Sequence, residues 1–114
     1  MSDDAIIFHI ALDQDIKKYQ VQGEYRCASL DSEGFIHCCD RHQLAGVVNR
    51  YYQESDNVQL MLLDPDKLHH PLIRENTMGG SELFPHVYGS INKEAIRDIV
   101  PFGRSSTERQ GLAE

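Results

Sequence analysis

Six histidines stand in this chain of 114 residues, and two of them occupy positions that suit chemistry. His37 lies in GFIHCCD, on an expected short strand that ends where a helix begins, and a helix N-terminus presents free N–H groups to a ligand. His86 lies in FPHVYG, where Pro85 stiffens the chain and Gly89 allows close approach of another backbone or a ligand. Because an imidazole can transfer a proton at neutral pH, His37 and His86 are candidate catalytic residues.

Two further polar residues could act with these histidines. Tyr88 follows His86 by two positions, so on an extended strand both side chains point to one face. That pair could bind a polar ligand, or its members could bind each other. Glu75 follows Arg74 at the end of an expected strand, and one of these two charges would face inward and need a partner. Glu75 could orient a histidine or a substrate hydroxyl, and the alternative is an ordinary carboxylate at a sheet edge.

His9 interrupts an otherwise apolar run over residues 6–12. Burying its ring without a partner would cost about 1–3 kcal/mol, so the ring either has a hydrogen-bond partner in the core or lines a cavity. Both interpretations are compatible with the sequence. The other histidines, His42, His69 and His70, are expected at the surface.

The three cysteines favour neither a disulfide framework nor a metal site. Cys38 and Cys39 are adjacent, so on a strand they point in opposite directions and cannot easily bind one ion. The spacing of His37, the two cysteines and His42 matches no standard zinc pattern. A cysteine nucleophile beside His37 is the alternative, but no orienting group is evident and buried cysteine usually serves packing. We expect no metal.

The charge balance bears on the kind of ligand. Eighteen acidic residues against eleven basic ones give a net charge of −7, which repels phosphate backbones at long range. Duplex nucleic acid is therefore not an expected partner. The acidic excess is concentrated in residues 1–40, so a small anionic ligand is expected near Arg41, Arg50 or Arg74.

The length predicts one domain over residues 1–103, followed by a polar tail over 104–114. No run reaches the roughly 20 apolar residues that a membrane span needs. The first residues are acidic where a signal peptide is basic. We therefore expect a cytoplasmic protein that does not bind membranes.

The elements that must position these side chains are mostly short strands. Alternating or continuous apolar runs between turn signals predict strands over residues 6–12, 35–38, 58–63, 72–75, 87–91 and 97–102. One helix is expected from Asp13, which could cap it, to about residue 20. The connections are expected to be an irregular or extended link over 25–30, a turn over 31–34, a flexible loop over 76–82 and one helical turn capped by Asn92.

A second helix is predicted over residues 41–53. Asp40 and Gln43 have the spacing of a capping box, and one helical face collects the apolar residues Leu44, Val47, Val48 and Tyr51. Most connections between strands are too short for crossover helices. The expected fold is therefore α+β, with a mainly antiparallel, twisted sheet and two or three helices.

The strings IFHIA, EGFIHCCDRHQL and IRENTMGGSELFPHVYG, taken in this order, resemble the small bacterial family called domain of unknown function 952. The resemblance covers roughly residues 5 to 102. Members usually carry an aromatic residue and a serine where this chain has Cys38 and Cys39, and a tryptophan in the first helix, which is absent here. The family is distantly similar to the ADP-ribosyltransferase fold, a split, mostly antiparallel sheet with a nicotinamide-dinucleotide cleft.

That resemblance implies roles for particular residues. His9 would hold the ribose or the nicotinamide amide, His37 would support the nicotinamide ribose, and Arg41 would join them in binding NAD. The third catalytic position has three candidates, His86, Tyr88 and Glu75. The implied activity is glycosyl, ADP-ribosyl or 2′-phosphate transfer with a nicotinamide dinucleotide.

Two alternatives to a transferase stay open. The same cleft could belong to a non-catalytic module that binds a small nucleotide-like molecule. The histidines could instead be packing residues of a protein whose function lies at a protein interface. The first two interpretations predict that His9, His37 and His86 converge in one cleft.

Overall fold

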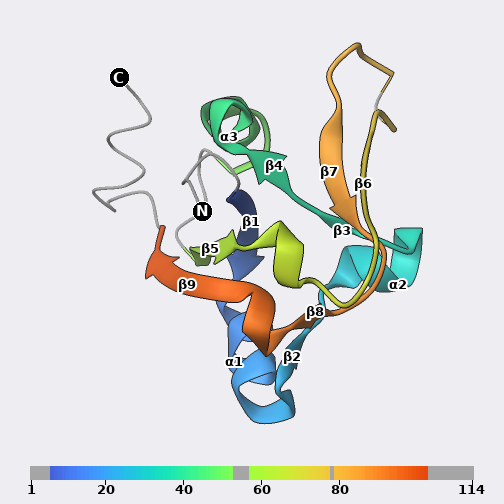
Figure 1. Cartoon of the computed structure of the whole chain (residues 1–114). Helices are drawn as coiled ribbons and strands as arrows, with labels where there is room; N and C mark the ends of the chain where they lie inside the picture. The colour runs from blue at the N-terminus through green and yellow to red at the C-terminus, as the bar shows by residue number, and fades with distance from the viewer. Residues whose placement is uncertain (1–5, 53–56, 78, 103–114) are drawn as a thin grey trace.

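The described residues of the computed structural model, 6–52, 57–77 and 79–102, form nine short strands and three α-helices (Figure 1). The strands are β1 (Ile7–Leu12), β2 (Glu24–Tyr25), β3 (Ile36–His37), β4 (Cys39–Asp40), β5 (Val58–Leu63), β6 (Leu72–Glu75), β7 (Phe84–Val87), β8 (Ile91–Asn92) and β9 (Ile96–Pro101). The helices are α1 (Asp13–Gln22), α2 (Ala28–Glu33) and α3 (Leu44–Val47). Short 3₁₀ turns are η2 (Arg41–Gln43), η4 (Pro65–Lys67) and η5 (Lys93–Ala95), and η3 (Val48–Tyr52) is π-helical.

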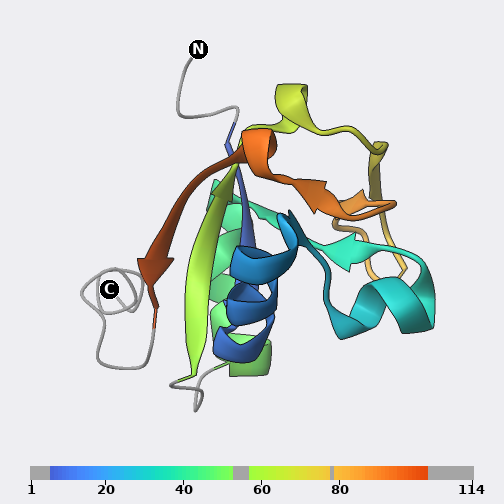
Figure 2. The same cartoon turned by 90° about the horizontal axis from the view of Figure 1, so that it is seen from below.

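The strands form three sheets, and every pairing between them is antiparallel. The largest has the order β4-β1-β5-β9, a second has the order β3-β7-β6, and β2 pairs with β8. The three-stranded sheet and α2 stand to one side of the four-stranded sheet (Figure 2). The predicted α+β class with a mainly antiparallel sheet is confirmed. The expected polar tail lies outside the described residues.

β1 is buried on both faces, as its nearly continuous apolar sequence predicts. Ile7 and Ala11 pack on one face in a cluster that includes Ile16 of α1. Phe8 and Ile10 pack on the other face, in a second cluster with residues of β5 and α3. Each large apolar side chain buried in this way contributes about 1.5–3 kcal/mol. The alternation along β1 therefore sends neighbouring side chains into two separate cores, and His9 shares a face with Ile7 and Ala11.

The first helix was predicted with the wrong cap. α1 begins at Asp13, and the residue at the N-cap position is Leu12, which offers no side-chain cap. The Asp13 carboxylate instead accepts a hydrogen bond from Gln59 of β5 (3.1 Å). The Asp13 side chain therefore binds a residue of strand β5, whereas the local pattern predicted that it would cap the helix. Gly23 ends the helix in the left-handed conformation (φ 83°).

The link over 25–30 and the turn over 31–34 were predicted wrongly, because α2 spans the join between them. None of its residues is buried, so the helix carries no apolar periodicity that a sequence pattern could detect. The turn-forming residues make its last turn, which Gly34 closes with φ 89°. This helix matters because it ends at Glu33, with two residues between it and the start of β3.

The helix expected over 41–53 forms through Tyr52, but only Leu44–Val47 has α geometry. The capping residues interact as predicted, since the Asp40 N–H donates to Gln43 Oε1 (2.8 Å). Gly46 and the adjacent valines have low helix propensity, which fits a helix that changes pitch. The side chain of Tyr51 lies outside the described part of the chain. None of the helices described here is long and apolar enough to cross a membrane.

The strand predicted over 87–91 is two strands in different sheets, β7 and β8, joined by a turn over 88–90. Gly89 permits this turn, since a Cβ there would lie 2.2 Å from the His70 ring. β9 begins at Ile96, one residue before the predicted start. Asn92 precedes a helical turn as predicted, but its side chain does not cap that turn. The Asn92 amide bonds the backbone of Lys67 and of His69 instead (3.0 and 2.9 Å).

Candidate functional site

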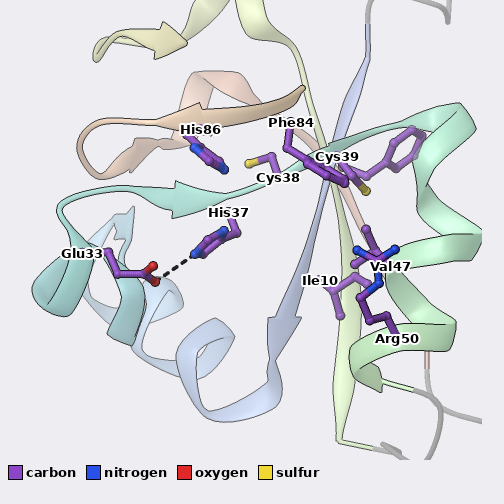
Figure 3. A pocket seen from close by; sticks show the side chains of 10 residues that line it. Ile10, Glu33, His37, Cys38, Cys39, Val47, Arg50, Phe84 and His86 are labelled. Carbon is purple, nitrogen blue, oxygen red and sulfur yellow. Dashed lines mark hydrogen bonds and ion pairs between the residues drawn. The ribbon is translucent and has the colours of Figure 1, made fainter. Parts of the chain in front are cut away.

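The sheets separate at Cys38, which joins β3 of the three-stranded sheet to β4 of the four-stranded sheet. The Cys38 N–H donates to the Pro85 carbonyl (3.0 Å), so it stays with β7 while the next residue turns toward β1. A cavity of about 440 Å³ opens beside this separation (Figure 3). Its lining comes from both sheets and from the helical segment after β4: Phe8, Ile10, Glu33, His37, Cys38, Cys39, Val47, Arg50, Phe84 and His86.

His86 projects from β7 into this cavity, and its ring is oriented by Glu75 of the neighbouring strand β6. The His86 Nδ1 lies 2.9 Å from Glu75 Oε2. The Tyr88 hydroxyl donates to the same carboxylate oxygen. These two hydrogen bonds lower the pKa of Glu75, the bond from Tyr88 having the larger effect. The ionised carboxylate in turn raises the pKa of Tyr88.

The second ring nitrogen of His86 has no such partner. Nδ1 faces a carboxylate, which only accepts, so Nδ1 carries the proton and Nε2 of the neutral ring presents a lone pair. Within the described ranges Nε2 has no hydrogen-bond partner, although the His86 side chain is only 3% exposed. Phe35 stacks on the ring with the centroids 4.2 Å apart, which fixes its plane. His86 thus lines the cavity, and its Nε2 is an acceptor with no partner among the described residues.

His37 lies directly opposite His86 in the register of β3 and β7. The two ring centroids are 5.1 Å apart with the planes nearly perpendicular. His37 Nε2 lies 2.8 Å from Glu33 Oε2 at the end of α2, and both of these side chains are about half exposed. Each cavity histidine therefore has its own carboxylate, and Figure 3 shows the one that Glu33 provides to His37. Glu75 is partly exposed and Glu33 is about half exposed.

His9 lies outside this set of lining residues, so the structure brings together His37 and His86 but not His9. Its Nδ1 lies 2.6 Å from the His37 carbonyl, which only accepts, so Nδ1 donates. The Tyr25 hydroxyl therefore donates to Nε2 (2.7 Å). Burial lowers the pKa of His9, although the bond to His37 opposes this shift. His9 is a satisfied core histidine, one of the two interpretations that the sequence left open.

The three arginines expected near an anionic ligand lie in different places. Arg50 lines the cavity from η3. The Arg41 guanidinium lies 5.1 Å from the centre of the Phe8 ring, and Phe8 is a lining residue. Arg74 forms two hydrogen bonds with Asp40 (2.9 and 3.3 Å), which join β6 to β4. Arg41 is thus beside the cavity without lining it, and Arg74 serves the framework.

Both cysteines of the lining are buried thiols. Burial raises the pKa of Cys38 well above its usual value and that of Cys39 to about 12. A thiol of this kind is protonated at neutral pH and is a weak nucleophile. Among the described residues no group of three or more histidine, cysteine, aspartate and glutamate side chains is arranged to hold a metal ion.

Sequence reasoning missed Glu33 and the aromatic support of Phe35. Glu33 stands four residues before His37, a spacing that indicates contact only within a continuous helix, and Gly34 breaks the helix between them. Phe35 contacts His37, His86 and Tyr88, with ring centroids 4.8, 4.2 and 5.3 Å away. The sequence does not indicate these ring contacts, because an apolar residue next to a polar one does not by itself predict that the two side chains pack together.

Comparison with known proteins places the chain in a family and matches its fold. The model of the family described as "Protein of unknown function (DUF952)" matches residues 10–99. The fold is similar to the crystal structure of protein CC0527 from Caulobacter crescentus, with a TM-score of 0.75 at 21% identity, covering 96% of this chain and 99% of that one. The solution NMR structure of CC0527 gives a TM-score of 0.73 at 21% identity, with 87% and 85% covered. These likenesses concern the fold, and no curated protein matches the chain.

Proposed function

This chain belongs to the DUF952 family, and we propose that it binds a small nucleotide-like molecule in the cavity between its two larger sheets. The observation that carries this proposal is His86 Nε2, a lone pair without a partner in the described structure on a side chain only 3% exposed. Leaving a buried polar atom unpaired costs about 1–3 kcal/mol. A ligand hydroxyl or amide N–H would satisfy it.

The size and lining of the cavity support the same conclusion. Its volume of about 440 Å³ lies within the roughly 300–1,000 Å³ of small-molecule pockets. Phe8 and Phe84 supply aromatic surface against which a flat heterocycle could pack. Glu33, His37 and His86 supply polar groups that would recognise hydroxyl groups. An apolar wall with a few convergent polar groups is the usual composition of a binding site.

Oxidised nicotinamide dinucleotide, NAD, is the first ligand to test. A cavity at the separation of two antiparallel sheets supports the resemblance to the ADP-ribosyltransferase fold, which binds NAD in such a cleft. In this proposal His37 and His86 contact the ligand, and Arg41 stands beside the site over Phe8. His9 is a positioning residue, because it holds the backbone carbonyl of His37.

A second candidate function is group transfer, and the Glu75–His86 hydrogen bond favours it. That bond fixes the tautomer whose Nε2 is basic, which is the arrangement of a general base. In the proposed step the C1′–N bond of the nicotinamide ribose breaks, and nicotinamide leaves with the bonding electron pair. The acceptor hydroxyl oxygen forms the new C1′–O bond, and its proton passes to His86 Nε2. With a 2′-phosphate as the acceptor group there is no hydroxyl proton to remove, and His86 would only bind.

The test is an amide NMR titration with NAD in which free nicotinamide is followed in the same samples. The wild type is compared with His86→Asn, whose amide N–H can still reach Glu75 but which lacks Nε2. His42→Asn is the matched control, because His42 is exposed and is not a lining residue. We expect shifts at the lining residues that are lost in His86→Asn and kept in His42→Asn.

The outcomes separate the two candidate functions. Release of nicotinamide by the wild type, lost in His86→Asn, would support transfer. Binding of NAD without release of nicotinamide would support the binding function and exclude transfer. Absence of any shift with millimolar NAD, adenosine or nicotinamide riboside would refute both candidates.

A further inference from the structure

The cavity has two chemically different ends (Figure 3). One end is rich in acceptors, since it holds His86 Nε2 and the carboxylate of Glu33 beside His37. Acceptors of this kind recognise hydroxyl or amine hydrogens. The Glu33 side chain is about half exposed, so this end of the cavity is in contact with solvent.

The other end is positive. Arg50 lines it from η3, and Figure 3 shows Arg50 on the side of the cavity away from Glu33. The Arg41 guanidinium is a second positive charge beside the cavity, 5.1 Å from the centre of the Phe8 ring. Arg41 and Arg50 belong to one helical segment, and in a chain with a net charge of −7 they place positive side chains at or beside the cavity. A guanidinium binds phosphate through charge-assisted hydrogen bonds.

Apolar side chains line the rest of the cavity, namely Phe8, Ile10, Val47 and Phe84. Figure 3 shows Phe84 between Arg50 and the two histidines, and Ile10 and Val47 beside Arg50. A ribose presents its 2′- and 3′-hydroxyls on the edge opposite its base and its 5′ substituent. Hydroxyls turned to His86 and Glu33 therefore direct the base toward the apolar wall and a 5′-phosphate toward Arg50.

The size of the cavity limits how much of a nucleotide it can enclose. At about 440 Å³ it lies in the lower part of the range for ligand pockets. A base, a ribose and one phosphate use all three kinds of lining surface. The second nucleoside of a dinucleotide would extend beyond the described lining residues into solvent.

We propose that the site is specific for a mononucleotide, with the ribose hydroxyls at His86 and Glu33 and a single phosphate at Arg50. This inference rests on the proposed binding function and names the part of the ligand that the cavity recognises. The phosphate could come from a free mononucleotide or from the nearer half of a dinucleotide. The experiment distinguishes these two sources.

The test compares three probes that share one base and one ribose: nicotinamide riboside, nicotinamide mononucleotide and NAD. Their dissociation constants are measured by calorimetry for the wild type, Arg50→Gln and Arg97→Gln. Arg97 is an exposed arginine of β9 that does not line the cavity, so it controls for the loss of one charge. Amide NMR spectra confirm that each variant keeps the fold.

We expect the wild type to bind the mononucleotide roughly tenfold more tightly than the riboside, as a charge-assisted hydrogen bond to phosphate implies. Arg50→Gln should remove this difference and leave the affinity for the riboside unchanged. Arg97→Gln should alter neither. NAD should bind within about threefold of the mononucleotide, since its second nucleoside adds few enclosed contacts.

Three results would overturn the inference. Equal affinity of the wild type for riboside and mononucleotide would show that the protein makes no favourable contact with the phosphate. An equal loss for both probes in Arg50→Gln would make Arg50 a structural residue. NAD binding far more tightly than the mononucleotide would assign the site to the dinucleotide. In each case, riboside binding at the lining residues would leave the proposed function intact. If no probe binds, both the proposed binding function and the inference of a mononucleotide site are refuted.

Discussion

His37 and His86 face each other across β3 and β7, and each is bound to a glutamate from a different element, Glu33 of α2 and Glu75 of β6. The two pairs differ in burial: the His86 side chain is 3% exposed and that of His37 is 43% exposed. The His86 ring is therefore shielded from solvent, whereas both side chains of the His37–Glu33 pair are partly exposed. In the proposed function, this difference would give recognition of the ligand to His86.

The first prediction concerns the tautomer of His86. Because Nδ1 faces the Glu75 carboxylate, the neutral ring should carry its proton on Nδ1. Long-range ¹H–¹⁵N spectra of the neutral ring should show a protonated Nδ1 and an unprotonated Nε2. Glu75→Gln should disturb this preference without unfolding the protein, since its amide can donate as well as accept. A wild-type spectrum with the proton on Nε2 would contradict the assignment.

The second prediction concerns the hydroxyl group of Tyr25. Tyr25 is fully buried and donates to His9 Nε2. Tyr25→Phe would leave that nitrogen unpaired in the core, so we expect a loss of about 1–3 kcal/mol in the free energy of unfolding. Tyr88→Phe is the control, because Tyr88 is only partly buried and its partner Glu75 remains open to water. Urea denaturation of both variants measures the difference, and equal losses would argue against a buried His9–Tyr25 bond.

The third prediction concerns pH. Burial lowers the pKa of His9 below its usual 6.5, so the unfolded chain takes up a proton at a higher pH than the folded chain does. The stability contributed by the neutral ring is present above pH 6.5 and is lost as the pH falls below it, with a slope of at most about 1.4 kcal/mol per pH unit.

Glu75 acts in a separate, lower window. Its pKa is lowered from 4.5, so its contribution is present above that pH and is lost only as the pH falls further. Urea denaturation at a series of pH values should therefore show a first decline below 6.5 and a second below 4.5. His9→Gln should remove the first decline and keep the second. A first decline that persists in His9→Gln would assign it to another histidine.

The fourth prediction concerns the cysteines. Because burial raises the pKa of both thiols, Cys38 and Cys39 should react slowly with iodoacetamide at pH 8 in the folded protein. Half-buried Cys27 serves as the internal comparison. Mass spectrometry of the alkylated peptides gives the alkylation rate of each cysteine. The rates of Cys38 and Cys39 should rise together when urea unfolds the protein. Rapid alkylation of Cys38 in the folded state would restore the cysteine nucleophile as an alternative.

The sequence predicted the central strand because its apolar run has only one fold-compatible interpretation, a strand buried on both faces. It also indicated that Glu75 could orient a histidine, but not which one. That contact depends on the hairpin register, in which Ile73 and not Glu75 lies directly opposite His86. A register of this kind is decided by pairing across the sheet, which a single sequence does not reveal.

His9 shows a different limit. An imidazole in an apolar strand requires a partner, and the sequence stated this requirement without identifying the partner. The donor Tyr25 comes from β2 and the acceptor carbonyl from the backbone of β3, so both partners arise only from the packed fold. Likewise α2 has no buried residue, and its helix formed where local turn residues predicted a link. Long-range contacts and exposed elements were therefore the parts that the sequence could not supply.

The most direct test of the central claim follows the His86 ring nitrogens while nicotinamide mononucleotide is added. The chain is labelled with ¹⁵N-histidine, and His86→Gln identifies the resonances. If the ligand donates a hydrogen bond to Nε2, that resonance should move with saturation while Nδ1, held by Glu75, stays nearly fixed. An Nε2 resonance that does not move while backbone amides elsewhere do would show that the ligand binds outside this cavity, and the account would be wrong.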